Sequence, residues 1–147
     1  VSAERKTISS TQAMRHTMNT SPLYPAWAEA SREDLRVALD AVRARDLPRL
    51  GEVVESNALG MHAAMIASRP SVVYWLPETL DVLHTVRVMR DEGFPVWATI
   101  DAGPNVKVLT TGEDADRVAT VLRDRIPCAT TSVRYPGGGV RVEEVTA

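Results

Sequence analysis

The spacing of the hydrophobic residues changes at Gly93, and this change restricts the folds open to the chain. Before Gly93, apolar residues recur at intervals of three and four, which gives an α-helix one apolar face. After it come two runs rich in β-forming residues, at 95–101 and 106–110. Helices followed by neighbouring strands predict an α+β domain, in which helices cover a mainly antiparallel sheet.

Helix start signals mark two helices in the first 45 residues. Ser9 and the glutamine three positions later fit a capping box, in which each side chain bonds the other's backbone N–H. Pro22 disfavours helical backbone at the residue before it and ends this helix. Segment 31–34 (SRED) repeats the signature and predicts a second helix, after a short irregular or helical link at 24–27. Its apolar face is expected to consist of Leu35, Leu39 and Val42.

Two further helices are expected before the strands. Asp46 caps the longest one, which runs to about Ser68. Its apolar stripe consists of Leu50, Val53, Val54, Asn57, Ala58, Met61 and Met65. After a short strand or extended linker at 71–75, Pro77 suits the first turn of a fourth helix that ends at Gly93. Its inward-facing residues are expected to be Leu80, Val82, Leu83, Val86 and Met89.

The last third of the chain is expected to complete the sheet. Segment 111–114 (TGED) caps a last helix, which Pro127 ends. Two final runs, at 129–135 and 140–145, flank three glycines and predict a hairpin, which raises the expected number of strands to four. No repeat or long linker divides the chain, so residues 1–147 are expected to form one domain.

The charge balance limits the partners of the chain. Lys and Arg number 17 against 19 Asp and Glu, so no overall charge attracts nucleic acid or an anionic membrane. No apolar run approaches the ~20 residues of a transmembrane helix, and the polar start is not a signal peptide. Cys128 is the only cysteine, which excludes an internal disulfide and fits a reducing compartment. We therefore expect a cytoplasmic protein.

Asp101 is the first candidate for a chemical role. Because side chains alternate along a strand, Trp97, Thr99 and Asp101 share one face, and Asp101 stands at the strand's end. Gly103 lets the backbone bend or approach a ligand, and Pro104 stiffens the turn. Such a mount suits a catalytic carboxylate. From the residues alone, the simpler interpretation is an Asx turn, in which the carboxylate accepts a nearby N–H.

The second candidate is a polar cluster at the start of the first predicted helix, made of Lys6, Ser9, Ser10 and Thr11. Free N–H groups and the positive end of the helix dipole favour a phosphate or carboxylate at such a place. Helix capping alone is the competing interpretation, and it is the preferred one for Ser9.

The remaining polar residues favour structural roles. Asn57 and His62 lie on or near the apolar stripe of the longest helix, where such side chains usually bond a neighbouring loop. His16 and His84 are isolated on their helices. Since the three histidines and one cysteine have no zinc-ligand spacing, no metal site is expected from them.

Three segments carry a family resemblance, namely 9–14 (SSTQAM), 55–63 (ESNALGMHA) and 99–108 (TIDAGPNVKV). Together with Trp27 and the pair at 74–75 (YW), they resemble the C-terminal half of diphosphomevalonate decarboxylases, which belong to the GHMP kinase superfamily. The resemblance implies a C-terminal domain of GHMP kinase type. It also implies an N-terminal half with the nucleotide-binding loop, which we expect to lie outside this sequence.

The resemblance further implies a reaction and its residues. The reaction uses ATP and Mg²⁺ to phosphorylate the 3-hydroxyl of (R)-5-diphosphomevalonate, then expels phosphate and carbon dioxide to leave isopentenyl diphosphate. Asp101 takes the position of the catalytic aspartate, and Ser10 and Thr11 those that contact the substrate's phosphate or carboxylate groups. Since a carboxylate is a weak base toward a tertiary alcohol, we expect Asp101 to orient the hydroxyl and accept its proton late. Supporting roles are expected for Lys6, Ser9, Gly103 and Asn105.

Two departures and two alternatives complete these expectations. Thr11 stands where many bacterial members have Arg, and Ala13 where the family often has Gly, so anion binding is expected to rely more on backbone N–H groups. The resemblance implies a homodimer, and a chain that is inactive without the half that binds ATP. The first alternative is a related mevalonate-type kinase that does not decarboxylate, against which Asp101 argues. The second is a non-catalytic α+β module for binding or dimerisation.

Overall fold

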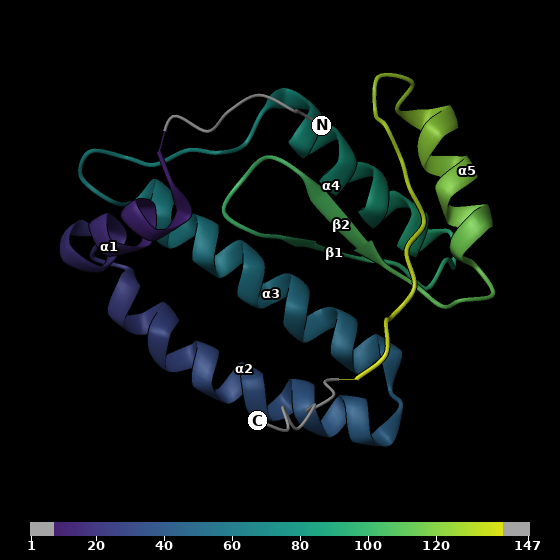
Figure 1. Cartoon of the computed structure of the whole chain (residues 1–147), viewed down its shortest axis with the longest axis horizontal. Helices are drawn as coiled ribbons and strands as arrows, with labels where there is room; N and C mark the ends of the chain where they lie inside the picture. The colour runs from purple at the N-terminus through teal and green to yellow at the C-terminus, as the bar shows by residue number, and fades with distance from the viewer. Residues whose placement is uncertain (1–7, 140–147) are drawn as a thin grey trace, which may run out of the picture.

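The computed structural model describes residues 8–139 and has the α+β organisation expected from the sequence (Figure 1). The elements in this part of the chain are α1 (Ser10–Thr20), α2 (Tyr24–Ala44), α3 (Leu47–Ile66), α4 (Pro77–Asp91), β1 (Trp97–Ile100), β2 (Val106–Leu109) and α5 (Ala115–Arg125). Lys6 and the expected strand at 140–145 lie outside the described residues.

The second helix is longer than predicted. α2 begins at Tyr24 and continues unbroken through Ser31, so the predicted start at Ser31 was wrong. Pro25 lies in the first turn, where its missing N–H costs no intrahelical hydrogen bond. The segment at 24–27 is therefore the start of the helix. Arg45 ends α2 in a left-handed conformation, with φ of 56°.

The apolar stripe of α2 does not pack inward as predicted. The exposed fractions of Leu35, Leu39 and Val42 are 61%, 46% and 58%. α2 instead meets α3 through Ala41, which is buried, and through Trp27, whose Nε1 donates to the Asn57 carbonyl at 3.2 Å. Leu80 of α4, also predicted to face inward, is 52% exposed. Helical spacing shows that residues share a face, but not that another element covers it.

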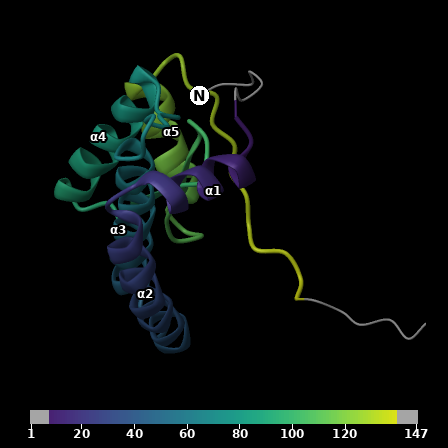
Figure 2. The same ribbon diagram turned by 90° about the vertical axis from the view of Figure 1, so that its left-hand side faces the viewer.

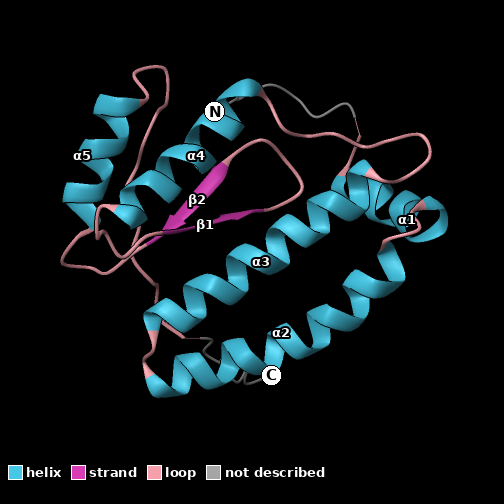
Figure 3. Ribbon diagram, turned by 180° about the vertical axis from the view of Figure 1, so that it is seen from behind, coloured by secondary structure: helices cyan, strands magenta, loops and turns pink. Residues whose placement is uncertain are grey.

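α3 is the central helix, with α2 on one side and the strands on the other (Figure 3). Asp46 caps it as predicted, since its carboxylate accepts the Arg49 N–H at 3.0 Å. Gly51 lets α3 approach β1 closely, because a Cβ at this position would lie only 2.0 Å from Cδ2 of Trp97. The ring of Trp97 therefore packs directly on the helix backbone.

The two strands form an antiparallel pair, in which Trp97 lies opposite Leu109 and Ile100 opposite Val106. The predicted alternation along β1 is confirmed. One set of side chains, Val96, Ala98 and Ile100, packs in a core cluster with Val82, Leu83, Val86 and Met89 of α4 and Val118 and Leu122 of α5. Trp97 points the other way, toward α3. Both faces of β1 are therefore covered.

The described residues contain two strands rather than the four predicted. Residues 129–135 form no strand within this region, although they lie beside β2 and α5, and Figure 2 shows the chain extending away from the helices toward residue 139. Side chains occupy the outer edge of β1, so a further strand could pair only with the outer edge of β2. Glu55 accepts the Ala98 N–H at 2.8 Å, and Arg90 Nε donates to the Val96 carbonyl at 2.9 Å.

Candidate functional site

Asp101 follows β1 directly and opens the turn toward β2, here called the Asp101 turn (residues 101–105). The side chain of Asp101 is 80% exposed, and its carboxylate forms an ion pair with Lys107 Nζ on β2. Ala102 and Gly103 are buried, whereas Asn105 is exposed. The backbone of the turn thus rests on the domain while the carboxylate faces outward, where a ligand can reach it.

Two buried side chains hold the carbonyl groups of this turn. His62 Nε2 of α3 lies 3.1 Å from the Asp101 carbonyl oxygen. Because a carbonyl only accepts, Nε2 carries the hydrogen. Thr79 Oγ1 of α4 donates to the Pro104 carbonyl at 2.8 Å. Their exposed fractions are 2% for His62 and 0% for Thr79, and the two hydrogen bonds are partly buried.

The environment of His62 keeps its imidazole neutral. Burial lowers the pKa of His62 below its ordinary value of 6.5, while the bonds to the backbone of Asp101 and Ile100 and the negative charge of Asp101 oppose this shift. The Trp75 ring packs against the imidazole, with 5.2 Å between the ring centroids. The prediction that His62 bonds a neighbouring loop is therefore confirmed, and the loop is the one that carries Asp101.

The N-terminus of α1 has the predicted capping box. The Ser9 hydroxyl accepts the Gln12 N–H at 3.2 Å, and Gln12 Oε1 accepts the Ser9 N–H at 3.3 Å. Ser9 therefore acts as a cap. Ser10 and Thr11 are exposed in the first turn of α1, where the first N–H groups of a helix have no intrahelical acceptor.

The C-terminal half of α3 brings α1 and the Asp101 turn to the same end of the domain (Figure 1). Met61 and Ile8 pack in one apolar cluster beside α1. The Tyr74 hydroxyl donates to the Ile8 carbonyl at 3.1 Å, and the ring of the next residue contacts His62. The two candidate regions therefore lie on either side of one stretch of helix.

Asn57 links two helices rather than contributing to this site. Its Nδ2 donates to the Asp34 carboxylate of α2 at 2.9 Å.

Within residues 8–139, no group of three His, Cys, Asp or Glu side chains could hold a metal ion. None of the helices in the same part of the chain is long and apolar enough to cross a membrane.

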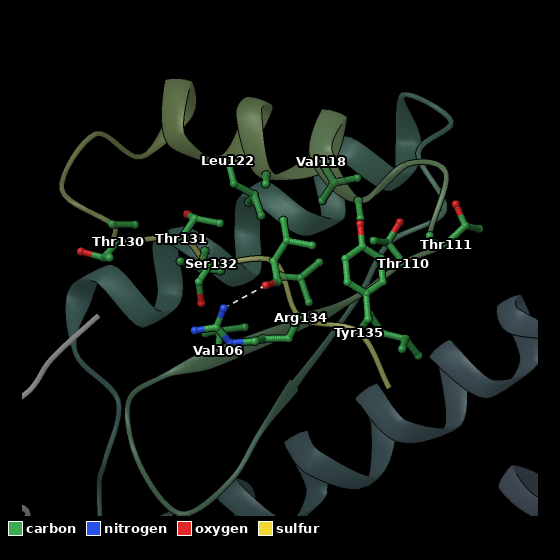
Figure 4. Close-up of a pocket in the computed structure, with 18 of the residues that line it drawn as sticks. Val106, Thr110, Thr111, Val118, Leu122, Thr130, Thr131, Ser132, Arg134 and Tyr135 are labelled. Atoms are coloured by element: carbon green, nitrogen blue, oxygen red, sulfur yellow. Dashed lines mark hydrogen bonds between the residues drawn. The ribbon is translucent and has the colours of Figure 1, made fainter. Parts of the chain in front are cut away.

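A cavity of about 560 Å³ lies between β2, α5 and the segment that follows α5 (Figure 4). Its lining includes Val106, Val118, Leu122, Thr130, Arg134 and Tyr135. Arg134 Nη1 donates to the neighbouring Val133 carbonyl at 3.1 Å. Asp101, Ser10 and Thr11 do not line the cavity, which is therefore separate from the candidate site.

The sequence matches one known protein family over nearly its whole length. The family model of the mevalonate 5-diphosphate decarboxylase C-terminal domain matches residues 1–144. The chain belongs to this decarboxylase family. Diphosphomevalonate decarboxylase of Homo sapiens is 34% identical over 152 residues, an alignment that covers 100% of this chain and 38% of the human protein. Phosphomevalonate decarboxylase of Haloferax volcanii is 33% identical over 100 residues, which are 67% of this chain and 30% of that protein.

Solved structures of the decarboxylase family share the fold. Mevalonate diphosphate decarboxylase of Staphylococcus aureus matches with a TM-score of 0.80 and 37% identity, over 84% of this chain and 38% of that one. A structure described as MDDEF in complex with MVAPP, AMPPCP and magnesium matches with a TM-score of 0.82 and 35% identity, over 87% and 39% of the two chains. The chain thus spans between 30% and 38% of the length of these two curated relatives.

Proposed function

We propose that the complete protein decarboxylates diphosphomevalonate to isopentenyl diphosphate with ATP and Mg²⁺, and that this chain supplies its catalytic carboxylate. The observation that carries the proposal is the exposed carboxylate of Asp101. It stands on a turn whose carbonyl groups accept hydrogen bonds from His62 of α3 and Thr79 of α4. The family match supports the reaction class. The related structure with MVAPP, AMPPCP and magnesium supports the choice of substrate and cofactors.

In the proposed mechanism, Asp101 acts on the 3-hydroxyl of the substrate. Its carboxylate accepts a hydrogen bond from this hydroxyl, directs the oxygen at the γ-phosphorus of ATP, and takes the proton late in the transfer. Loss of phosphate and carbon dioxide then leaves the double bond. Phosphoryl transfer depends mainly on positioning and charge stabilisation, which a rigidly mounted carboxylate provides. Mg²⁺ would neutralise charge on the phosphates, and we assign its ligands to the rest of the complete protein.

The N-terminus of α1 is the proposed anion site. Ser10 and Thr11 expose hydroxyl groups beside first-turn N–H groups that have no acceptor within the helix, a combination that suits a phosphate or carboxylate of the substrate. Lys6, Gly103 and Asn105 remain proposed supporting residues. In the complete protein, Ser10→Ala and Thr11→Ala should raise the Kd for diphosphomevalonate more than they lower kcat. Unchanged affinity in both variants would contradict the proposed anion site.

The finer features of the assembly are also proposals. We infer that residues 1–147 form one GHMP kinase-type domain, whose four-stranded sheet gains strands beyond the β1–β2 pair. We also infer that the protein is cytoplasmic and that it forms a homodimer. The exposed Leu35, Leu39 and Val42 of α2 support an apolar contact with another copy. Light scattering on the complete protein tests this, and a monomer at micromolar concentration would contradict it.

One of the relatives suggests phosphomevalonate as an alternative substrate. The Haloferax volcanii relative is named for phosphomevalonate, which carries one phosphate fewer. The test incubates the complete protein with ATP and each substrate, and measures carbon dioxide, ADP and the prenyl product. Isopentenyl diphosphate from diphosphomevalonate is the expected result. If carbon dioxide forms from phosphomevalonate but not from diphosphomevalonate, phosphomevalonate is the substrate. If ADP forms without carbon dioxide, the protein is a kinase that does not decarboxylate.

A further inference from the structure

We propose that His62 and Thr79 are positioning residues, which fix the Asp101 turn so that its carboxylate meets the substrate hydroxyl in one geometry. The inference rests on the proposed function, because it concerns how the same carboxylate is aimed. His62 and Thr79 belong to different helices, and each binds one carbonyl of the turn.

The need for such positioning follows from the exposure of Asp101. The ion pair of its carboxylate with Lys107 joins two side chains that are 80% and 63% exposed. Exposed ion pairs restrain their side chains weakly, because water and salt compete for both charges. The direction of the carboxylate therefore depends on where the backbone of the turn is held.

His62 is suited to hold the first carbonyl of the turn. Its ring is 2% exposed and packs against Trp75, so it cannot rotate freely. Nε2–H of this ring donates to the Asp101 carbonyl at 3.1 Å, and the backbone of Ile100 next to it also interacts with the ring. The Asp101 carbonyl belongs to the same residue as the reacting carboxylate, so a shift of the backbone here moves the carboxylate directly.

Thr79 holds the second carbonyl and ties the turn to the start of α4. Its hydroxyl donates to the Pro104 carbonyl at 2.8 Å and accepts the Leu76 N–H at 3.1 Å. The buried hydroxyl of Thr79 thus uses both its donor and its acceptor function. With one bond from α3 and one from α4, the turn cannot shift along either helix without breaking a partly buried hydrogen bond.

The test measures steady-state kinetics of variants of the complete protein. His62→Phe keeps the ring but removes the donor, and it should lower kcat about 10- to 100-fold with KM within about twofold, since small misplacements of reacting groups cost this much. His62→Gln, which restores a donor, should recover most of the rate. His16→Phe is the matched control, because His16 Nε2 also bonds a loop carbonyl, that of Pro70 at 2.8 Å. It should leave kcat unchanged.

A double variant separates positioning from a general structural role. If His62 acts through the Asp101 carboxylate, His62→Phe should reduce kcat far less in an Asp101→Asn background than in the wild type. Equal reductions in both backgrounds, or a folded His62→Phe variant with wild-type kcat, would overturn the positioning role. Wild-type activity of Asp101→Asn alone would instead refute the proposed function.

Thr79 gives a second test that does not depend on how well His62→Phe folds. Thr79→Val removes the hydroxyl at nearly constant shape, and Thr79→Ser retains it. The expected result is a kcat loss of about 10-fold or more for the valine variant and near wild-type kcat for the serine variant. Equal kcat values in the two variants would overturn the role of the hydroxyl.

Discussion

Alanine at position 51 should weaken the packing of α3 on β1, although alanine favours helix more than glycine does. The new Cβ would lie 2.0 Å from Cδ2 of Trp97, 2.2 Å from Cγ and 2.6 Å from Cε3. Carbon atoms in contact lie about 3.5–4.0 Å apart, so the ring or the helix must move by roughly 1.5 Å. Trp97 is 5% exposed, which leaves the ring little space to move into.

The net effect is the difference between two terms. Replacing a glycine inside a helix by alanine gains about 0.5–1 kcal/mol. Overpacking a close-packed core costs about 1–3 kcal/mol. The two terms leave a net loss of between about 0 and 2.5 kcal/mol, and because the Cβ would approach Trp97 to 2.0 Å we expect Gly51→Ala to lie in the upper half of this range. Because Trp97 begins the strand that leads to Asp101, kcat should fall as well.

Urea denaturation of Gly51→Ala beside Gly60→Ala tests this reasoning. Both glycines lie in α3, but a Cβ at Gly60 would meet only Cδ1 of Trp27 at 3.0 Å and Nε1 at 3.7 Å. A displacement of a few tenths of an ångström relieves that contact, so Gly60→Ala should change stability by less than about 0.5 kcal/mol. A Gly51→Ala protein as stable as the Gly60→Ala protein would refute the close approach of α3 to Trp97.

Three further predictions concern stability. Glu55→Gln should destabilise the complete protein by about 1–3 kcal/mol in urea denaturation, because the carboxylate binds Arg90 Nη2 at 2.6 Å and the Ala98 N–H at 2.8 Å. Asp46→Ala removes the cap of α3 and should cost about 1 kcal/mol, read as a lower Tm. Burial lowers the pKa of His62 below 6.5, so below that pH the unfolded chain takes up a proton first. The stability that comes from keeping His62 neutral is therefore present above pH 6.5 and is lost as the pH falls toward the pKa of the folded state. In His62→Gln, the free energy of unfolding should fall less over this pH range.

The sequence predicted those elements whose signals are local. The cap at Asp46 and the capping box at Ser9 satisfy backbone groups within four residues, so a short pattern is sufficient to locate them. The alternation along β1 and the end of α4 shortly before Gly93 are local in the same way, since Gly93 adopts a φ of 92° that favours glycine.

Other features depend on what covers a surface, which periodicity does not reveal. The stripe of Leu35, Leu39 and Val42 has perfect helical spacing, yet no element of the described chain covers it. The segment at 129–135 lies beside β2 and α5 without pairing as a strand, and its β-forming composition does not distinguish these two outcomes.

The candidate site was predictable in part. Asp101 could be placed at the end of a strand from alternation alone, and its exposure agrees with a role toward a ligand. That His62 meets the backbone of residue 101 could not be derived, because the contact joins residues 39 positions apart. A buried polar residue on an apolar stripe was the available signal. The role of Thr79 had no signal in the sequence, since helix-start threonines commonly serve as caps.

The role of Asp101 is tested most directly by Asp101→Asn in the complete protein, with ATP-dependent release of carbon dioxide from diphosphomevalonate as the readout. The change keeps the size of the side chain and its exposed position but removes the proton acceptor. We expect kcat to fall by about 10²–10⁴-fold, with KM and Tm close to wild type. Retention of most of the carbon dioxide release would contradict the assignment of Asp101 as the catalytic carboxylate.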